Sequence, residues 1–245
     1  MCRHLAYVGT PIDLHAPLFG SSHSLCAQAR HPRHQETGDT NPDGWGVGWY
    51  ADGAVEPELY RTVTSVWDDR DFAASARTIT TGAFLAAARL ASPGAAVTAT
   101  GNAPFRSGRW LFSLNGIVRG FHDDVGPGLR ARVSAARRAQ IVGDTDSEVL
   151  FAMVLDRLDA GEPPAVALGA VAGDVHEVAT ARINLLLTDG TQIAATRSGR
   201  SLFVRGSTIV SEPLDDGPGW REVPEGATVT VAAAGEDAQV TIGAR

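Results

Sequence analysis

The order of the expected elements constrains this chain most strongly, because a helical block separates two stretches rich in strands. Apolar patterning and start signals predict helices at residues 129–140, 146–160 and 164–177. Strands precede and follow this block without the repeating strand–helix–strand order of a parallel sheet. We therefore expect an α+β fold in which two mainly antiparallel sheets stack face to face, with helices on the outside.

The same patterning locates the remaining elements. We expect strands at residues 5–8, 45–50, 59–64, 83–89, 110–114, 181–188, 192–198, 202–205, 208–211 and 228–232, and a further helix at 69–80. Residues 13–43 have little periodicity and are expected to form loops, and residues 212–220 a packed loop. No Pro/Ser-rich or charged linker interrupts the chain, so residues 1–245 are expected to form one domain.

Charge and composition exclude several functional classes. The chain has 21 basic and 28 acidic residues, a net charge of −7, which argues against nucleic acid as a partner. Its apolar stretches are much shorter than the roughly 20 residues of a membrane helix, and the first residues lack the apolar region of a signal peptide. We expect a cytoplasmic protein that does not bind membranes.

The few cysteines and clustered histidines predict neither disulfides nor a metal. Two cysteines cannot form a disulfide framework in a chain of this length. The histidines between residues 15 and 34 lack cysteine or acidic partners at zinc-binding spacing. We therefore expect no metal and no cofactor.

Cys2 is unusual in a chain that uses cysteine so rarely. Methionine aminopeptidases remove Met1 when a small residue follows, which would leave Cys2 with a free α-amine. Such an amine has a pKa of about 7.7–8.0, so one residue would supply a nucleophile and a general base. The alternative is that Cys2 is an ordinary packed side chain, the interpretation that we keep for Cys26.

Four downstream residues would suit an amide hydrolase, although each also has a structural interpretation. Asn115 and Gly116 follow an apolar strand and could form an oxyanion hole or simply a hairpin turn. Arg89 ends an apolar strand, where it could bind an anion or form a structural salt bridge. Asp146 begins a helix, where it could bind a cation or cap the helix.

Together these residues resemble the glutaminase domain of class II glutamine amidotransferases, which are N-terminal nucleophile hydrolases. The matching motifs, in the family's order, are Met1-Cys2, residues 43–50, 89–92, 102–105, 114–117 and 145–148. The resemblance implies a four-layer α-β-β-α sandwich, with Cys2 as nucleophile and its amine as base. It also implies an oxyanion hole of Asn115 and Gly116, with Arg89 and Asp146 binding the α-carboxylate and α-ammonium of a glutamyl group.

Two further residues are expected to bind substrate, and three departures from the family pattern are evident. Ser92 lies in the arginine motif, and Trp45, or alternatively Trp220, could contact a substrate cation through its ring. Histidines that the family often has are replaced by Leu114 and Pro93, and one is missing from the motif at residues 102–105. These departures weaken the expectation that the chain acts as an ordinary glutamine amidotransferase.

A closer resemblance covers nearly the whole chain and is to the γ-glutamyl amidohydrolases of ergothioneine biosynthesis. It is carried by residues 1–5, 41–48, 103–105, 181–186, 211–213 and 218–220. It implies hydrolysis of the γ-glutamyl amide of hercynylcysteine sulfoxide, a small-molecule substrate, with release of glutamate. The alternatives are a glutaminase subunit that supplies ammonia to a partner synthetase, and a catalytically silent binding protein. A homo-oligomer is possible in each case.

Overall fold

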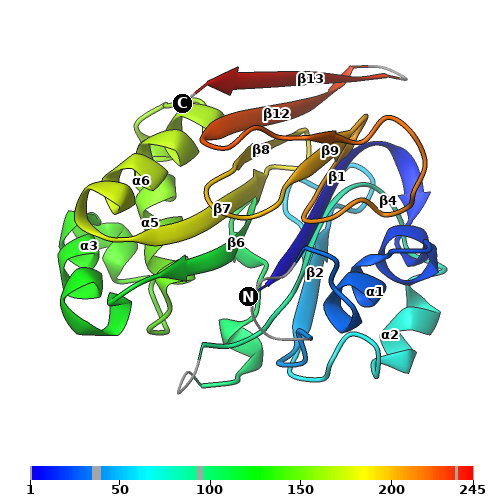
Figure 1. Ribbon diagram of the computed structural model, residues 1–245, viewed down its shortest axis with the longest axis horizontal. Coiled ribbons are helices and arrows are strands. Elements are labelled where there is room, and N and C mark those ends of the chain that lie inside the picture. Colours follow the sequence, from blue (N-terminus) through cyan, green and yellow to red (C-terminus); the bar gives the residue numbers. More distant parts are fainter. Residues whose placement is uncertain (1, 35–39, 93–95, 235–236, 245) are drawn as a thin grey trace.

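The computed structural model describes residues 2–34, 40–92, 96–234 and 237–244. In these residues the strands form two antiparallel sheets that stack face to face, with helices on both outer faces (Figure 1). This arrangement confirms the predicted four-layer α-β-β-α sandwich.

The first sheet has the strand order β11-β9-β10-β1-β4-β2-β3. Its strands are β1 (Arg3–Asp13), β2 (Trp45–Trp49), β3 (Glu58–Thr62), β4 (Thr80–Ala88), β9 (Phe203–Arg205), β10 (Thr208–Val210) and β11 (Arg221–Glu222). The second sheet has the order β13-β12-β8-β7-β6-β5. Its strands are β5 (Phe105–Ser107), β6 (Trp110–Val118), β7 (Ala181–Thr188), β8 (Gln192–Thr196), β12 (Ala227–Ala234) and β13 (Asp237–Ala244).

The helices cover the two outer faces. The α-helices are α1 (Leu25–Arg30), α2 (Arg70–Ser75), α3 (Gly126–Arg132), α4 (Ala135–Arg138), α5 (Asp146–Asp159) and α6 (Pro164–Val178). Three short helical turns are η1 (Ala16–Gly20), η2 (Ala99–Gly101) and η3 (Phe121–Val125). Helices α5 and α6 pack on the second sheet, and α1 and α2 lie against the first (Figure 1). Among the described residues, no helix is long and apolar enough to cross a membrane.

Strand alternation divides the core into three layers. On β1, Ala6 and Val8 face the second sheet, whereas Leu5 faces α1 on the outside. The middle layer lies between the sheets and joins these residues to Leu186 and Val229 of the second sheet. Successive side chains of a strand point to opposite faces of its sheet. Because each sheet is covered on both faces, residues at successive positions are buried and the strands are largely apolar.

Several sequence predictions differ from the structure. Residues 13–43 were expected to be loops, but they contain η1 and α1, a helix that Ser24 caps through Ala27 N–H. The helix expected at 129–140 is two helices, because the chain turns at Val133 and Ser134 caps a new helix. The strand expected at 110–114 continues to Val118, so the Asn115-Gly116 pair lies within β6 and is not a turn.

Candidate active site

One cavity brings together most of the residues that the sequence singled out. It has a volume of about 340 Å³ and is lined by Cys2, Arg89, Ser92, Gly116 and Asp146. These residues come from the start of β1, the end of β4, the middle of β6 and the start of α5. The sheets place residues that are far apart in sequence around one space.

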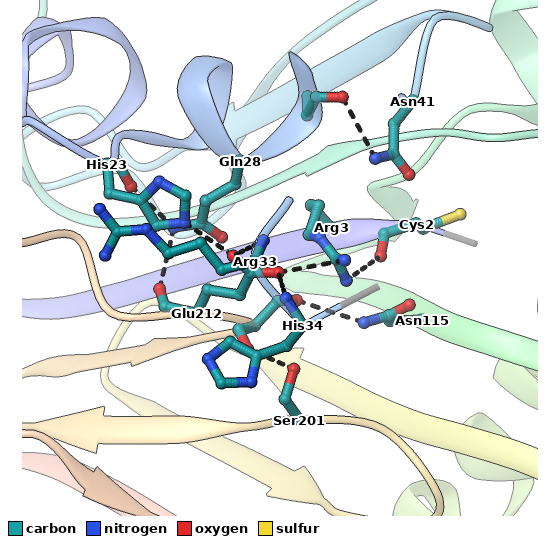
Figure 2. Close-up of polar contacts among 12 residues, drawn as sticks. Cys2, Arg3, His23, Gln28, Arg33, His34, Asn41, Asn115, Ser201 and Glu212 are labelled. Atoms are coloured by element: carbon teal, nitrogen blue, oxygen red, sulfur yellow. Dashed lines mark hydrogen bonds and ion pairs between the residues drawn. The ribbon is translucent and has the colours of Figure 1, made fainter. Parts of the chain in front are cut away.

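The register of the first sheet explains how Arg89 comes close to Cys2. Antiparallel pairing puts Arg3 of β1 opposite Ala88 of β4, so the next residues outward are Cys2 and Arg89. On the other side of Arg89, its N–H donates to Gly44 O at 2.9 Å, which fixes the backbone at the end of β4. Cys2 itself is half-buried and its thiol is free. Figure 2 shows the Cys2 sulfur directed away from the buried Arg3 side chain.

The hydrogen bonds that the structure describes for the Arg89 guanidinium go to neutral acceptors. Its Nη1 donates to Ala96 O at 3.2 Å and to Asn102 Oδ1 at 3.3 Å. Asn102 is fully buried and donates in turn to Thr62 O at 2.7 Å. No carboxylate within the described ranges forms an ion pair with Arg89, so the alternative of a structural salt bridge has no partner among these residues. An anionic ligand group in the cavity would supply the missing partner.

Gly116 directs its backbone N–H toward the cavity. Gly116 lies opposite Ile183 of β7, but the Ile183 N–H donates to Ser198 O on the far side of β7. The two residues therefore form a non-hydrogen-bonded pair, and the Gly116 N–H points away from β7. Val118 has the same orientation two residues later, and its N–H donates to Asp146 Oδ2 at 3.1 Å.

The Asn115 side chain is completely buried beside Gly116. Its Nδ2 donates to Ser211 Oγ at 3.3 Å, and its Oδ1 has no hydrogen-bond partner in the described residues. The Ser211 hydroxyl donates to His4 O at 3.3 Å. A half-turn of the Asn115 amide would let that hydroxyl donate to the amide oxygen instead, and would place the NH₂ group where that oxygen stands. Ser211 also accepts from His4 N–H at 2.9 Å, so it is fixed to β1 next to Cys2.

Asp146 supplies a carboxylate that forms no ion pair within the described residues, although His122, which lines the same cavity, favours its ionised form. It is the first residue of α5, but the helix is capped by Thr145, whose Oγ1 accepts from Glu148 N–H at 3.3 Å. The two Asp146 oxygens accept from the N–H groups of Val118 and Ser147. Burial raises the pKa of Asp146 above its ordinary value, against the opposing effect of these hydrogen bonds. Within the described part of the chain no arginine or histidine forms an ion pair with it.

The arrangement can hold a ligand that carries an anion and a cation at one end and a carbonyl at the other. The guanidinium of Arg89 and the carboxylate of Asp146 line the same cavity as the Cys2 thiol and the Gly116 backbone. The family pattern of glutamine amidotransferases of class II matches residues 18–208. The chain belongs to the class II glutamine amidotransferase family.

Relatives of known name and structure extend this class II assignment. Two γ-glutamyl-hercynylcysteine sulfoxide hydrolases are similar over nearly their whole length. The one from Mycolicibacterium smegmatis is 34% identical over 99% of both chains. The one from Mycobacterium tuberculosis strain H37Rv is 33% identical over 96% of this chain and 94% of the relative. A solved class II domain protein from Silicibacter pomeroyi, 27% identical, superposes over 100% of both chains with a TM-score of 0.70.

Trp45 does not line the cavity that contains Cys2, so the expectation that it binds substrate is corrected. The side chain is completely buried on the outer face of the first sheet, where it packs edge-on against Phe72 with ring centroids 5.0 Å apart. Its Nε1 donates to Asp69 Oδ2 at 3.0 Å. Trp220 is likewise engaged, because the Arg205 guanidinium lies 4.2 Å from its ring centroid. Ser92, by contrast, lines the cavity and is exposed.

A buried polar network behind Cys2 was missed by sequence reasoning. Glu212 is completely buried, pairs with Arg3 at 3.1 Å and accepts from His23 Nε2 at 2.7 Å (Figure 2). It also accepts from the N–H groups of Arg33 and His34 at 2.8 and 2.9 Å. Burial raises the pKa of the Glu212 carboxyl, but these hydrogen bonds and the Arg3 charge outweigh it and hold the pKa at about 2. The Cys2-Arg3-His4 and Ser211-Glu212 motifs were the only signals for this network.

Proposed function

We propose that this protein hydrolyses a γ-glutamyl amide and releases glutamate, and that its substrate is γ-glutamyl-hercynylcysteine sulfoxide. The observation that carries the proposal is one cavity that holds the Cys2 thiol, the Arg89 guanidinium and the Asp146 carboxylate, neither of which forms an ion pair within the described residues. The substrate is taken from the printed names of two relatives that share about a third of the sequence.

The glutamyl end of the substrate has two complementary groups in the pocket. Its α-carboxylate pairs with the Arg89 guanidinium, and its α-ammonium pairs with the Asp146 carboxylate. Charged hydrogen bonds of this kind are the stronger ones in proteins, and two of opposite sign select an amino acid in one orientation. The γ-carbonyl then extends toward Cys2 and Gly116.

Acylation begins with Cys2 as the first residue of the mature chain; Met1 lies outside the described residues. The α-amine of Cys2 takes the thiol proton, and the sulfur forms a bond to the carbon of the γ-carbonyl group, whose C=O π electrons move to the oxygen. The Gly116 N–H and the Asn115 amide, after its half-turn, donate to the oxygen that becomes negative. The amine then passes its proton to the leaving nitrogen as the C–N bond breaks.

Deacylation uses water and the same groups. The α-amine takes a proton from water, whose oxygen attacks the thioester carbon while the oxyanion is held as before. Collapse of this intermediate breaks the C–S bond, and the proton returns to the sulfur. Glutamate leaves with its α-carboxylate and α-ammonium still facing Arg89 and Asp146.

The test is turnover of the conjugate against free glutamine by the purified protein alone. We expect kcat/KM to favour the γ-glutamyl-hercynylcysteine sulfoxide by at least about tenfold, with glutamate as a product, and activity to vanish in Cys2→Ala. Cys26→Ala is the matched control, since that cysteine lies within α1 and does not line the cavity, and its replacement should leave turnover unchanged. Preference for glutamine would instead support a glutaminase subunit, and no turnover of either compound would support a binding protein.

A further inference from the structure

A second cavity, of about 280 Å³, lies at one edge of the sandwich and shares no lining residue with the Cys2 pocket among the described residues. Its walls come from the edge strands β3 and β5 and from helices α4 and α5. None of the residues that line this cavity has a role in the proposed reaction.

Two arginines of this cavity form no ion pair with a carboxylate among the described residues. Arg61 Nη1 donates to the carbonyl oxygens of Thr100 at 3.1 Å and Asn102 at 3.4 Å. Arg106 Nη1 donates to Pro57 O at 3.0 Å. Throughout the described ranges neither guanidinium forms an ion pair. Burial lowers the pKa of Arg61, Glu148 opposes this, and the nearby Arg106 charge lowers it further. Two like charges are thus held toward one space.

The other charged groups of the cavity are already engaged. Arg137 donates to both carboxylate oxygens of Asp159, at 2.8 and 2.9 Å. Glu148 accepts from Gly143 N–H at 2.8 Å and from the Thr145 hydroxyl at 3.0 Å, so its oxygens are held by the loop before α5. With Arg137 balanced by Asp159, the charges of Arg61 and Arg106 stand against the single negative charge of Glu148. This leaves an excess of positive charge at the cavity in a chain whose net charge is −7. Such local excess attracts an anion regardless of the net charge.

The rest of the cavity wall is apolar. Phe105 and Phe151 are almost completely buried there, and Leu59 and Leu155 extend the same surface. At the rim, Val142 is 88% exposed. A bare inorganic anion would leave these surfaces in contact with water, whereas an organic anion would cover them.

We propose that this cavity binds a small organic carboxylate, whose charged group pairs with Arg61 and Arg106 while an apolar body about the size of an aromatic ring packs against Phe105 and Phe151. The site is separate from the cavity that we propose for the glutamyl group, but Asn102 is hydrogen-bonded to one arginine of each cavity. Asn102 accepts from Arg61 through its backbone oxygen and from Arg89 through its side chain.

The experiment titrates the full-length protein with benzoate and follows backbone amide chemical shifts by NMR. We expect one saturable site with the largest shifts at Arg106 and Glu148. Arg61→Gln and Arg106→Gln should each weaken binding about tenfold to a hundredfold, the range for a charge-assisted hydrogen bond. Arg106 is exposed with one carbonyl contact, so its variant should retain the wild-type melting temperature even if Arg61→Gln does not.

Controls separate this site from the Cys2 pocket and from general attraction of anions. Arg89→Gln and Arg77→Gln, an exposed arginine after α2, should leave benzoate binding unchanged. Benzyl alcohol, which lacks the charge, and inorganic phosphate, which lacks the apolar body, should bind at least tenfold more weakly. Benzoate binding that survives both Arg61→Gln and Arg106→Gln, or that is lost in Arg89→Gln, would overturn the proposal. Equal affinity for phosphate would overturn the organic part of it.

Discussion

Asn115 offers the active site a single buried amide, so its contribution can be measured by removing that group alone. We predict that Asn115→Ala lowers kcat by roughly 10²–10³-fold with little change in KM, the usual effect of losing one oxyanion donor. Steady-state kinetics with the conjugate tests this. Ser211→Ala should give a smaller loss, because the amide stays but loses its hydroxyl partner. An Asn115→Ala enzyme within tenfold of the wild type would remove this residue from the oxyanion hole.

Asp146 should make substrate capture depend on pH. Burial raises the pKa of its carboxyl in the free enzyme, and an ammonium ligand favours the ionised form and lowers that pKa again. As pH falls, kcat/KM should therefore decline at a higher pH than kcat does. Asp146→Asn should abolish this difference and raise KM by about tenfold to a hundredfold. Identical acid limbs in the variant and the wild type would contradict the role of Asp146.

Glu212 should make the fold sensitive to acid. Its pKa in the folded protein is about 2, below the ordinary 4.5, so ionisation stabilises the fold above about pH 5 and this contribution is lost as pH falls toward 2. The shift corresponds to roughly 3 kcal/mol. Urea unfolding from pH 7 to pH 3 should show Glu212→Gln strongly destabilised at pH 7, with the gap to wild type narrowing toward pH 3. A constant gap would contradict this account.

At the scale of elements, β6 determines the geometry of the site, and Gly116 is its most constrained position. A Cβ on Gly116 would collide with the Arg182 carbonyl oxygen of β7. Gly116→Ala should therefore separate β6 from β7, destabilise the protein and reduce kcat. Gly169→Ala in α6 is the matched control, since its Cβ would meet only Thr228 Cγ2 at 3.6 Å, and it should stabilise the fold by up to about 1 kcal/mol. Equal effects of both changes on urea unfolding and kcat would contradict this.

The sequence predicted most long elements of this fold but not their limits. Asn-Gly is a strong hairpin signal, yet here β7 supplies a partner for β6 through Val118, so tertiary pairing overrides the local turn preference. Helix α1 has six residues and shows too little periodicity to be recognised without its cap at Ser24. By contrast, α5 and the two strands at 181–188 and 192–198, which pair as β7 and β8, followed directly from patterning.

At the scale of the whole molecule, the fold class was predictable from the order of strands and helices in the sequence. A helical block between two stretches of strands is typical of antiparallel sheets whose outer faces are covered by helices. The gathering of Cys2, Arg89 and Asp146 was predicted by resemblance. The register of the first sheet explains the placement of Cys2 and Arg89, and the hydrogen bond from Val118 N–H holds Asp146 at the edge of β6. The network around Glu212 was not predictable, since Arg3 and Glu212 are 209 residues apart and nothing local indicates that they pair. The prediction that Trp45 binds substrate was wrong for a related reason, because its indole packs in the core on the outer face of the first sheet.

The central claim is that Cys2, as the first residue of the mature chain, carries the glutamyl group during turnover. Acid quenching during steady-state turnover of the conjugate, followed by mass spectrometry of the N-terminal peptide, tests it most directly. The account predicts a peptide that begins at Cys2 and carries a glutamyl thioester, which is absent in Cys2→Ala and unchanged in Cys26→Ala. Full activity in a protein that retains Met1, or a glutamyl group on any other residue, would contradict it.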